Sequence, residues 1–221
     1  MGFLEIENPD IFYTGEDFNL SAQSNKELQL PDDNWCLPAC VTTLIYYWKE
    51  VTNDNFPIPF KKDMNFWIDI WSKIIQKGRR HAAFAPTSYD KIPTILKELK
   101  LNDLLVFKKE ESTCDLLNHV KRFVTHFIPI PVIVEVLAAK FYNQPSLLGS
   151  RHAILILGFQ KPNFFQIYDP AKPELRQYWT PRNEELMENC MAAPYHMAFI
   201  IPKKLNQIPV IPYKQARVDE W

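Results

Sequence analysis

The chain lacks the features that would place it in several common classes. No segment approaches the roughly 18 consecutive apolar residues of a transmembrane helix. The N-terminal residues, MGFLEIEN, are acidic and carry no apolar segment of the kind that a secretory signal peptide has. Glycine is scarce, at five of 221 residues, and no Gly- or Ser-rich linker or repeat divides the chain. We therefore expect a single domain over residues 1–221, cytoplasmic or exported without a classical signal peptide, with no membrane partner.

An excess of charge of either sign is also missing. Lys and Arg number 25 against 26 Asp and Glu, which gives a formal net charge of -1. Binding to nucleic acid phosphates requires a basic surface, so we expect no nucleic-acid partner. With 47% hydrophobic and 23% charged residues, the composition is that of an ordinary globular protein, which we expect to be a monomer.

The cysteines and histidines do not form the common metal and redox motifs. The chain has four cysteines but no CxxC pair, and it is long enough to fold without a disulfide framework. Four histidines lack metal-ligand spacing: His81, His119, His126 and His196. The glycine-rich loops that bind dinucleotides or nucleotide phosphates are absent as well. We expect reduced thiols, no metal and no cofactor.

Apolar residues recur at helical spacing in the first half of the chain. The expected helices cover residues 36–50, 63–78 and 92–99, with a fourth that begins near residue 113. Their expected N-terminal caps are Asp63, either Ser88 or Asp90, and Thr113. We take the aromatic-rich face of the second helix as core packing. Together these elements form an expected helical part over about residues 35–127.

The second half has the texture of β-strands. Runs of β-branched and aromatic residues predict strands over residues 130–136, 153–159, 164–168 and 197–201. A short helix is expected near residues 183–191. Helices followed by strands indicate the α+β class, with a mostly antiparallel sheet over about residues 128–202 and extended termini.

Cys36 stands where a loop meets the predicted first helix. Free backbone N–H groups and the positive end of the helix dipole favour a thiolate at that position, and the thiolate is the nucleophilic form of cysteine. The same N–H groups can donate to a developing oxyanion. Cys36 is therefore a candidate nucleophile, although a lone cysteine is more often a buried structural residue. Cys40, one helical turn later, fits that structural role.

His152 and Asp169 have the placement that a catalytic base and its orienting partner need. His152 begins one predicted strand, and Asp169 follows the next strand, 17 residues later (169 minus 152). If the strands pair through a turn near residues 161–163, both residues lie near one end of the hairpin. Asp169 could then accept a hydrogen bond from the imidazole, which is how a third residue orients a base.

Three segments together resemble a known family. They read NWCLPAC at 34–40, RHAILILGF at 151–159 and IYDP at 167–170. Over roughly residues 29–201 the chain resembles the papain-like cysteine peptidases, in particular the bacterial branch related to double-glycine leader peptidases. The resemblance implies a papain-like fold with Cys36 as nucleophile at the start of the central helix. It also implies His152 as general base and acid, and Asp169 as the residue that orients the imidazole.

The acyl site departs from the family pattern in two ways. The family usually has glycine directly after the nucleophile, whereas this chain has Leu37, which brings a bulky side chain to that position. The family's oxyanion glutamine usually lies six residues before the cysteine, whereas Gln29 lies seven before it (36 minus 29). The expected oxyanion donors are Gln29 and Asn34, with Gln23 as an alternative. Gln29 can equally be a solvated loop residue.

Three functions fit these residues. The leading one is a cysteine hydrolase that cleaves a peptide or amide bond of a peptide or protein substrate through a thioester. The same triad also serves an acyltransferase or deamidase that acts on a protein target, as an effector or toxin would. The third is an inactive papain-like scaffold that binds a peptide or protein. Leu37 and the shifted Gln29 motivate this last alternative.

Overall fold

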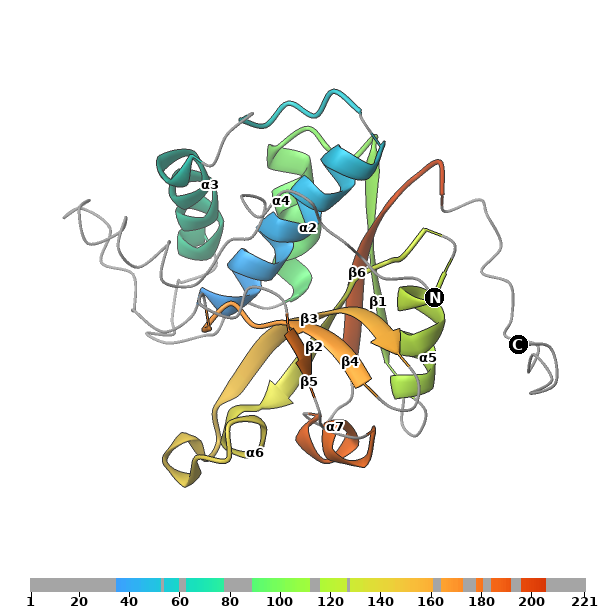
Figure 1. The fold of residues 1–221 in the computed structure, drawn as a ribbon. Coiled ribbons are helices and arrows are strands. Elements are labelled where there is room, and N and C mark those ends of the chain that lie inside the picture. The colour runs from blue at the N-terminus through green and yellow to red at the C-terminus, as the bar shows by residue number, and fades with distance from the viewer. Residues whose placement is uncertain are drawn as a thin grey trace, which may run out of the picture.

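The computed structural model describes residues 35–52, 54–59, 63–77, 89–111, 116–126, 128–160, 164–172, 178–180, 184–191 and 196–205. In these residues an open sheet of six strands is flanked by helices (Figure 1). The strands are β1 (Leu105–Glu111), β2 (Val132–Leu137), β3 (Arg151–Gln160), β4 (Phe164–Tyr168), β5 (Tyr178–Thr180) and β6 (His196–Pro202). They lie in the order β1-β6-β2-β3-β4-β5, and every pair is antiparallel. The predicted α+β class and antiparallel sheet are thus confirmed.

Helices lie on both sides of these strands. They are α2 (Cys36–Thr52), α3 (Met64–Lys77), α4 (Ile92–Glu98), α5 (Leu116–Val124), α6 (Ala138–Phe141) and α7 (Glu184–Cys190). Two short 3-10 turns, η2 (Tyr89–Lys91) and η3 (Pro145–Leu147), accompany them. Figure 1 shows α2 and α3 above β3 and β4, and α6 and α7 below.

Helix α2 is enclosed on nearly all sides. Every residue of α2 from Leu37 to Trp48 is buried, which is typical of a helix in a protein core rather than on its surface. The indole N–H of Trp48 donates to the carbonyl oxygen of Ile200, and this bond ties α2 to β6. On another side, the indole of Trp71 in α3 donates to Thr42 Oγ1 at 3.2 Å. These contacts fix α2, and with it the position of Cys36.

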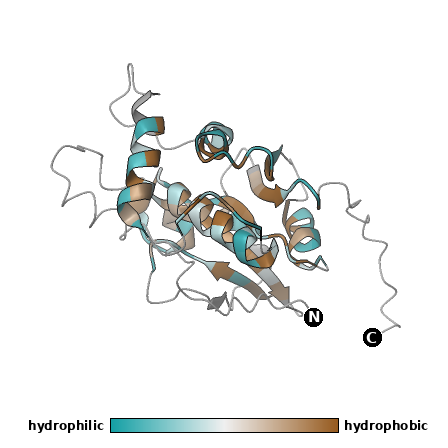
Figure 2. Cartoon of the chain, turned by 90° about the horizontal axis from the view of Figure 1, so that it is seen from above, coloured by the Kyte–Doolittle hydropathy of each residue, from teal (hydrophilic) through white to brown (hydrophobic). Residues whose placement is uncertain are grey.

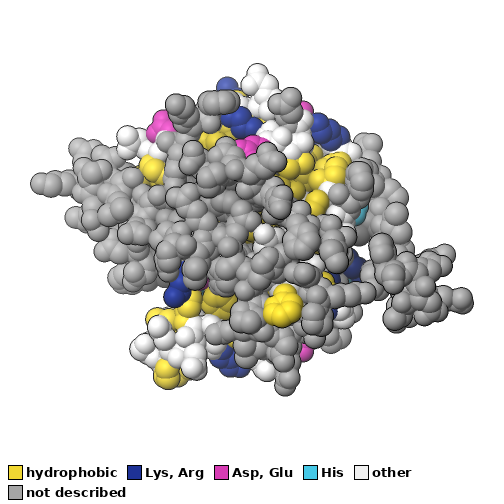
Figure 3. All heavy atoms as spheres, in the orientation of Figure 1, with side chains coloured by type: hydrophobic (Ala, Val, Ile, Leu, Met, Phe, Trp, Pro, Cys, Tyr) yellow, Lys and Arg dark blue, Asp and Glu magenta, His cyan; other side chains and the backbone are white. Residues whose placement is uncertain are grey.

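The aromatic-rich second helix packs into the core, as predicted. Trp67 and Trp71 of α3 are fully buried, whereas Asp69 and Lys73 on the other face are exposed and form an ion pair at 2.5 Å. In Figure 2 the helical ribbons change between hydrophilic and hydrophobic colours along their length, as amphipathic helices do. On the described part of the face in Figure 3, basic and acidic side chains are interspersed rather than segregated.

The predicted helix starts are confirmed in part. Asp63 caps α3, because its carboxylate accepts a hydrogen bond from the backbone N–H of Phe66 at 3.1 Å. Asp90, one of the two expected caps, is not the N-cap residue of α4. The N-cap of α4 is Lys91, which already has helical backbone angles and makes no side-chain cap. The 3-10 turn η2 leads into the helix instead. Ser88 and Thr113 lie outside the described residues.

The four predicted strands are present, but the sheet also has strands that the sequence patterns did not indicate. The clearest is β1, which lies within the part expected to be helical and pairs with β6 along its whole length. Its second half, Lys108 to Glu111, is charged, as is common in an edge strand, and this breaks the hydrophobic alternation. The other edge strand, β5, has three residues and is too short to give a pattern.

Candidate active site

Cys36 is the first residue of α2. The backbone N–H of Ala39 bonds to the carbonyl oxygen of Trp35 at 2.9 Å, so the helix begins at the thiol. Cys36 is partly exposed, whereas Leu37, the next residue, and Cys40, one helical turn later, are buried. The helix N-terminus expected at Cys36 is therefore present.

The surroundings of Cys36 favour its thiolate. Burial by itself opposes the charge, but a hydrogen bond and the positive charge of His152 outweigh that effect and lower the pKa of Cys36. Backbone hydrogen bonds from Ala153 and Leu37 act in the same direction. The helix start and the adjacent strand thus both contribute to stabilising the thiolate.

His152 is the second residue of β3 and lies where β3 extends past the end of its neighbour β4. It pairs with Val136 of β2 on one side. On the other side, β4 ends at Tyr168, which pairs with Leu155, so β3 continues beyond the end of β4. His152 is 8% exposed, and its imidazole lies beyond the end of β4, beside the N-terminus of α2.

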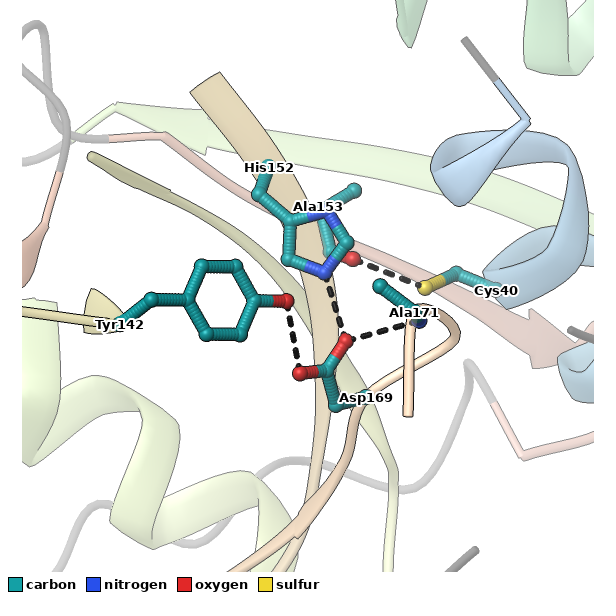
Figure 4. Close-up of polar contacts among 6 residues, drawn as sticks. All are labelled: Cys40, Tyr142, His152, Ala153, Asp169 and Ala171. Carbon is teal, nitrogen blue, oxygen red and sulfur yellow. Dashed lines mark hydrogen bonds and ion pairs between the residues drawn. The ribbon is translucent and has the colours of Figure 1, made fainter. Parts of the chain in front are cut away.

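Asp169 follows β4 directly and contacts the imidazole. Its Oδ1 lies 2.7 Å from His152 Nε2, and its side chain is fully buried. The backbone N–H of Ala171 also donates to Oδ1, at 2.9 Å, and the hydroxyl of Tyr142 donates to Oδ2, at 2.7 Å. In Figure 4, these donors surround the carboxylate, and Tyr142 and Cys40 approach from opposite sides of the view.

The charges of His152 and Asp169 stabilise each other. Burial works against an imidazolium, but the hydrogen bonds and negative charges of Asp169 and Cys36 raise the pKa of His152 to about 9. Burial likewise opposes the carboxylate, yet the bonds from His152, Ala171 and Tyr142 lower the pKa of Asp169. Cys36, His152 and Asp169 therefore lie together, as the sequence spacing led us to expect, with complementary charges.

Cys40 differs from Cys36 although it lies only one turn away. Its Sγ donates to the carbonyl oxygen of Ala153 at 3.6 Å, and the residue is fully buried. Burial, together with the negative charges of Cys36 and Asp169, raises the pKa of Cys40 well above its ordinary value. Cys40 thus remains a neutral thiol that joins α2 to β3.

The positions expected to surround a bound acyl group are described only in part. Gln29, Asn34 and Gln23, the expected oxyanion donors, lie outside the described residues. Leu37 is 3% exposed and belongs to the hydrophobic core. Its side chain therefore packs inward rather than lying free beside the thiol.

Sequence reasoning missed two tyrosines. Tyr142 directly follows a four-residue helix, α6, whose length gives no periodic signal. Tyr89 is 4% exposed, and its hydroxyl has no hydrogen-bond partner among the described residues. Burial, followed by the charges of Glu135, Cys40 and Cys36, raises the pKa of Tyr89. Tyr142 donates a hydrogen bond to Asp169, and the negative charges of Cys40 and Cys36 contribute to the raised pKa of Tyr89.

Neither a metal site nor a membrane-spanning helix is present in the described residues. No three His, Cys, Asp or Glu side chains are grouped there as a metal site would require. None of the helices in these ranges has the length and hydrophobicity needed to cross a membrane.

No protein family model, no curated protein and no solved structure matches the chain.

Proposed function

We propose that this protein is a cysteine hydrolase with a papain-like arrangement of Cys36, His152 and Asp169. The observation that carries the proposal is the 2.7 Å contact between His152 and Asp169, next to a partly exposed Cys36 at a helix N-terminus. A nucleophile, a base and a residue that orients the base are thus drawn from three separate elements.

The expected reaction begins with attack of the Cys36 thiolate on the carbonyl carbon of a peptide or amide. The backbone N–H of Cys36, at the start of α2, can stabilise the oxyanion that forms. The His152 imidazolium gives its proton to the leaving amine, and a thioester remains on Cys36. His152, now neutral, takes a proton from water, which attacks the thioester and releases the acid.

Transfer and deamidation use the same first step. In transfer an amine replaces water, and in deamidation the amide is a glutamine side chain. The mass of the product separates these cases. Cleavage of a chain indicates a peptidase, a gain of about one mass unit indicates deamidation, and a joined product indicates transfer.

The proposal is tested first by the pH dependence of iodoacetamide alkylation, read by peptide mass spectrometry. Cys36 should be alkylated with an inflection well below the ordinary thiol pKa of about 8.5, because the thiolate is the form that reacts. The other cysteines in the same folded sample, Cys40, Cys114 and Cys190, serve as internal references.

The matched control compares two histidine variants. His152→Ala should move the Cys36 inflection upward. His119→Ala should not, although His119 also has a carboxylate partner, since its Nδ1 lies 3.7 Å from Glu110 Oε2. If Cys36 reacts no faster than the other cysteines and His152→Ala changes nothing, the hydrolase proposal fails and the binding scaffold is favoured.

A second test asks for turnover. A library of peptides and amides is incubated with the protein, with Cys36→Ala, and with Asp169→Asn, and the products are weighed. Thiol-dependent products should require Cys36 and decline strongly in Asp169→Asn, while circular dichroism shows that both variants fold.

A further inference from the structure

The segment between β2 and β3 is built to hold Tyr142 in one orientation. Tyr142 is the C-cap of α6, and its backbone N–H bonds to Ala138 O at 2.9 Å. Two further bonds close the helix end, from Asn143 N–H to Lys140 O at 3.4 Å and from Gln144 N–H to Ala139 O at 2.9 Å. This is the Schellman pattern, in which the residue after the cap takes left-handed angles. Asn143 has a φ of 56°, as that pattern requires.

The side chain of Tyr142 contacts the site in three ways. Its hydroxyl donates to Asp169 Oδ2 at 2.7 Å, as Figure 4 shows. The centre of its ring lies 5.6 Å from that of His152, with 46° between the ring planes. The ammonium of Lys172, which lies just after Asp169, is 5.5 Å from the ring centre. The β4 exit turn and the segment after β2 therefore meet at this phenol.

We infer that Tyr142 is a positioning residue of the site, whose hydroxyl holds the Asp169 carboxylate so that Oδ1 stays on His152. This inference rests on the proposed function and deepens it. A carboxylate can rotate about its Cβ–Cγ bond, so a bond to one oxygen does not fix its plane. With Tyr142 on Oδ2 and Ala171 on Oδ1, both oxygens are bound and the rotation is blocked.

Burial makes this bond important. Asp169 is fully buried, and a buried anionic oxygen without a donor is strongly unfavourable. Without the Tyr142 hydroxyl, the carboxylate has to turn toward another donor or take up a proton. Either change weakens its bond to His152 Nε2. The effect then passes from the imidazole to the thiolate of Cys36.

The groups whose charges favour the imidazolium are Asp169 at the end of β4 and Cys36 on α2. Arg151, beside His152 in β3, forms an ion pair with Glu135 of β2 at 3.2 Å. The effect of Tyr142 is therefore expected to pass through Asp169.

The test uses Tyr142→Phe, which removes the hydroxyl and keeps the ring. The matched control is Tyr47→Phe, because Tyr47 donates to a backbone carbonyl, that of Pro129, at 2.6 Å, in another part of the molecule. Both variants should lower the midpoint of urea unfolding. Only Tyr142→Phe should lower the pKa of His152, followed by NMR of labelled histidine, and slow Cys36 alkylation at neutral pH by about tenfold, a loss that a hydrogen bond to a charged group can account for.

Two results would overturn the inference. If Tyr142→Phe lowers stability like Tyr47→Phe but leaves the His152 pKa unchanged, Tyr142 is structural only. If it raises the His152 pKa, the hydroxyl weakens the carboxylate rather than positioning it.

If Tyr142→Phe does not fold, a second variant leaves the phenol in place. Asn143→Val strains the left-handed position and should lower the His152 pKa, whereas Asn143→Gly should not.

The result can be separated from failure of the proposed function. An ordinary, unactivated Cys36 in the wild-type protein counts against the hydrolase whatever Tyr142 does. The His152 titration needs no substrate and no turnover. It therefore reports on Tyr142 and Asp169 even if no reaction is found.

Discussion

Leu155 of β3 lies opposite Tyr168 of β4, and this pairing determines which face of the sheet Asp169 reaches. Nearer the turn, Gly158 lies opposite Gln166, and an unbroken register from there would place Asp169 opposite Leu155. Instead the register shifts by one between Ile156 and Gly158, where Leu157 has no partner in β4.

The consequence of this bulge follows from the alternation of side chains along a strand. Continued from Tyr168, the observed register places Asp169 opposite Ile154. Ile154 and His152 are two residues apart and project from the same face, whereas Leu155 projects from the other. The bulge therefore brings Asp169 to the face of His152, in keeping with the frequent use of bulges to aim a side chain near a functional site.

A first prediction concerns the titration of His152. Its pKa of about 9 is above the ordinary value of 6.5 because of bonds and charges from Asp169 and Cys36, which exceed the opposing effect of burial. In NMR spectra of histidine-labelled protein, one resonance that His152→Ala removes should titrate near this value. Asp169→Asn should move it downward, since the carboxylate charge is lost. A His152 signal that titrates near 6.5 in the wild-type protein would contradict the charged pair.

A second prediction concerns stability as a function of pH. The folded protein holds the His152 proton more tightly than the unfolded chain does. The resulting stabilisation is complete below pH 6.5 and is lost as the pH rises through about 9. The lowered pKa of Cys36 acts in the opposite direction, because its contribution is lost as the pH falls. In the wild-type protein the two effects partly cancel.

The Cys36→Ala variant separates them. Relative to the double variant Cys36→Ala/His152→Ala, the free energy of unfolding of Cys36→Ala should fall between pH 6.5 and 9. The fall should be up to about 1.4 kcal/mol for each unit by which the His152 pKa is still raised. Urea unfolding at several pH values measures the difference. Parallel curves for the two variants would mean that Asp169 does not favour the imidazolium.

The sequence predicted the hairpin that joins His152 to Asp169, because β3 and β4 are rich in β-branched and aromatic residues. It also predicted the helix start at Cys36. The bulge at Leu157 could not be predicted, because it depends on the pairing of two strands rather than on the alternation within one. Tyr142 was missed for a similar reason, since its contact with Asp169 joins residues 27 apart through a short irregular segment.

A third prediction concerns Leu37, which occupies the position where the resembled family has glycine. Because Leu37 is buried in the core, its loss leaves a cavity rather than a wider substrate site. Leu37→Ala should lower the free energy of unfolding by about 2–5 kcal/mol. Leu37→Gly should lower it at least as much, because it removes the same buried side chain. Urea denaturation measures both, and a change in substrate preference at unchanged stability would show that Leu37 lies in the acyl site instead.

A fourth prediction concerns the buried hydroxyl of Tyr89, which has no hydrogen-bond partner among the described residues. Leaving such a group unsatisfied costs about 1–3 kcal/mol, so Tyr89→Phe should raise the free energy of unfolding by an amount of this order. Tyr47→Phe is the control, because it removes a hydroxyl that is hydrogen-bonded and should lower stability. The two variants should therefore shift the urea midpoint in opposite directions. If Tyr89→Phe instead destabilises the protein as much as Tyr47→Phe, the hydroxyl has a hydrogen-bond partner in solution.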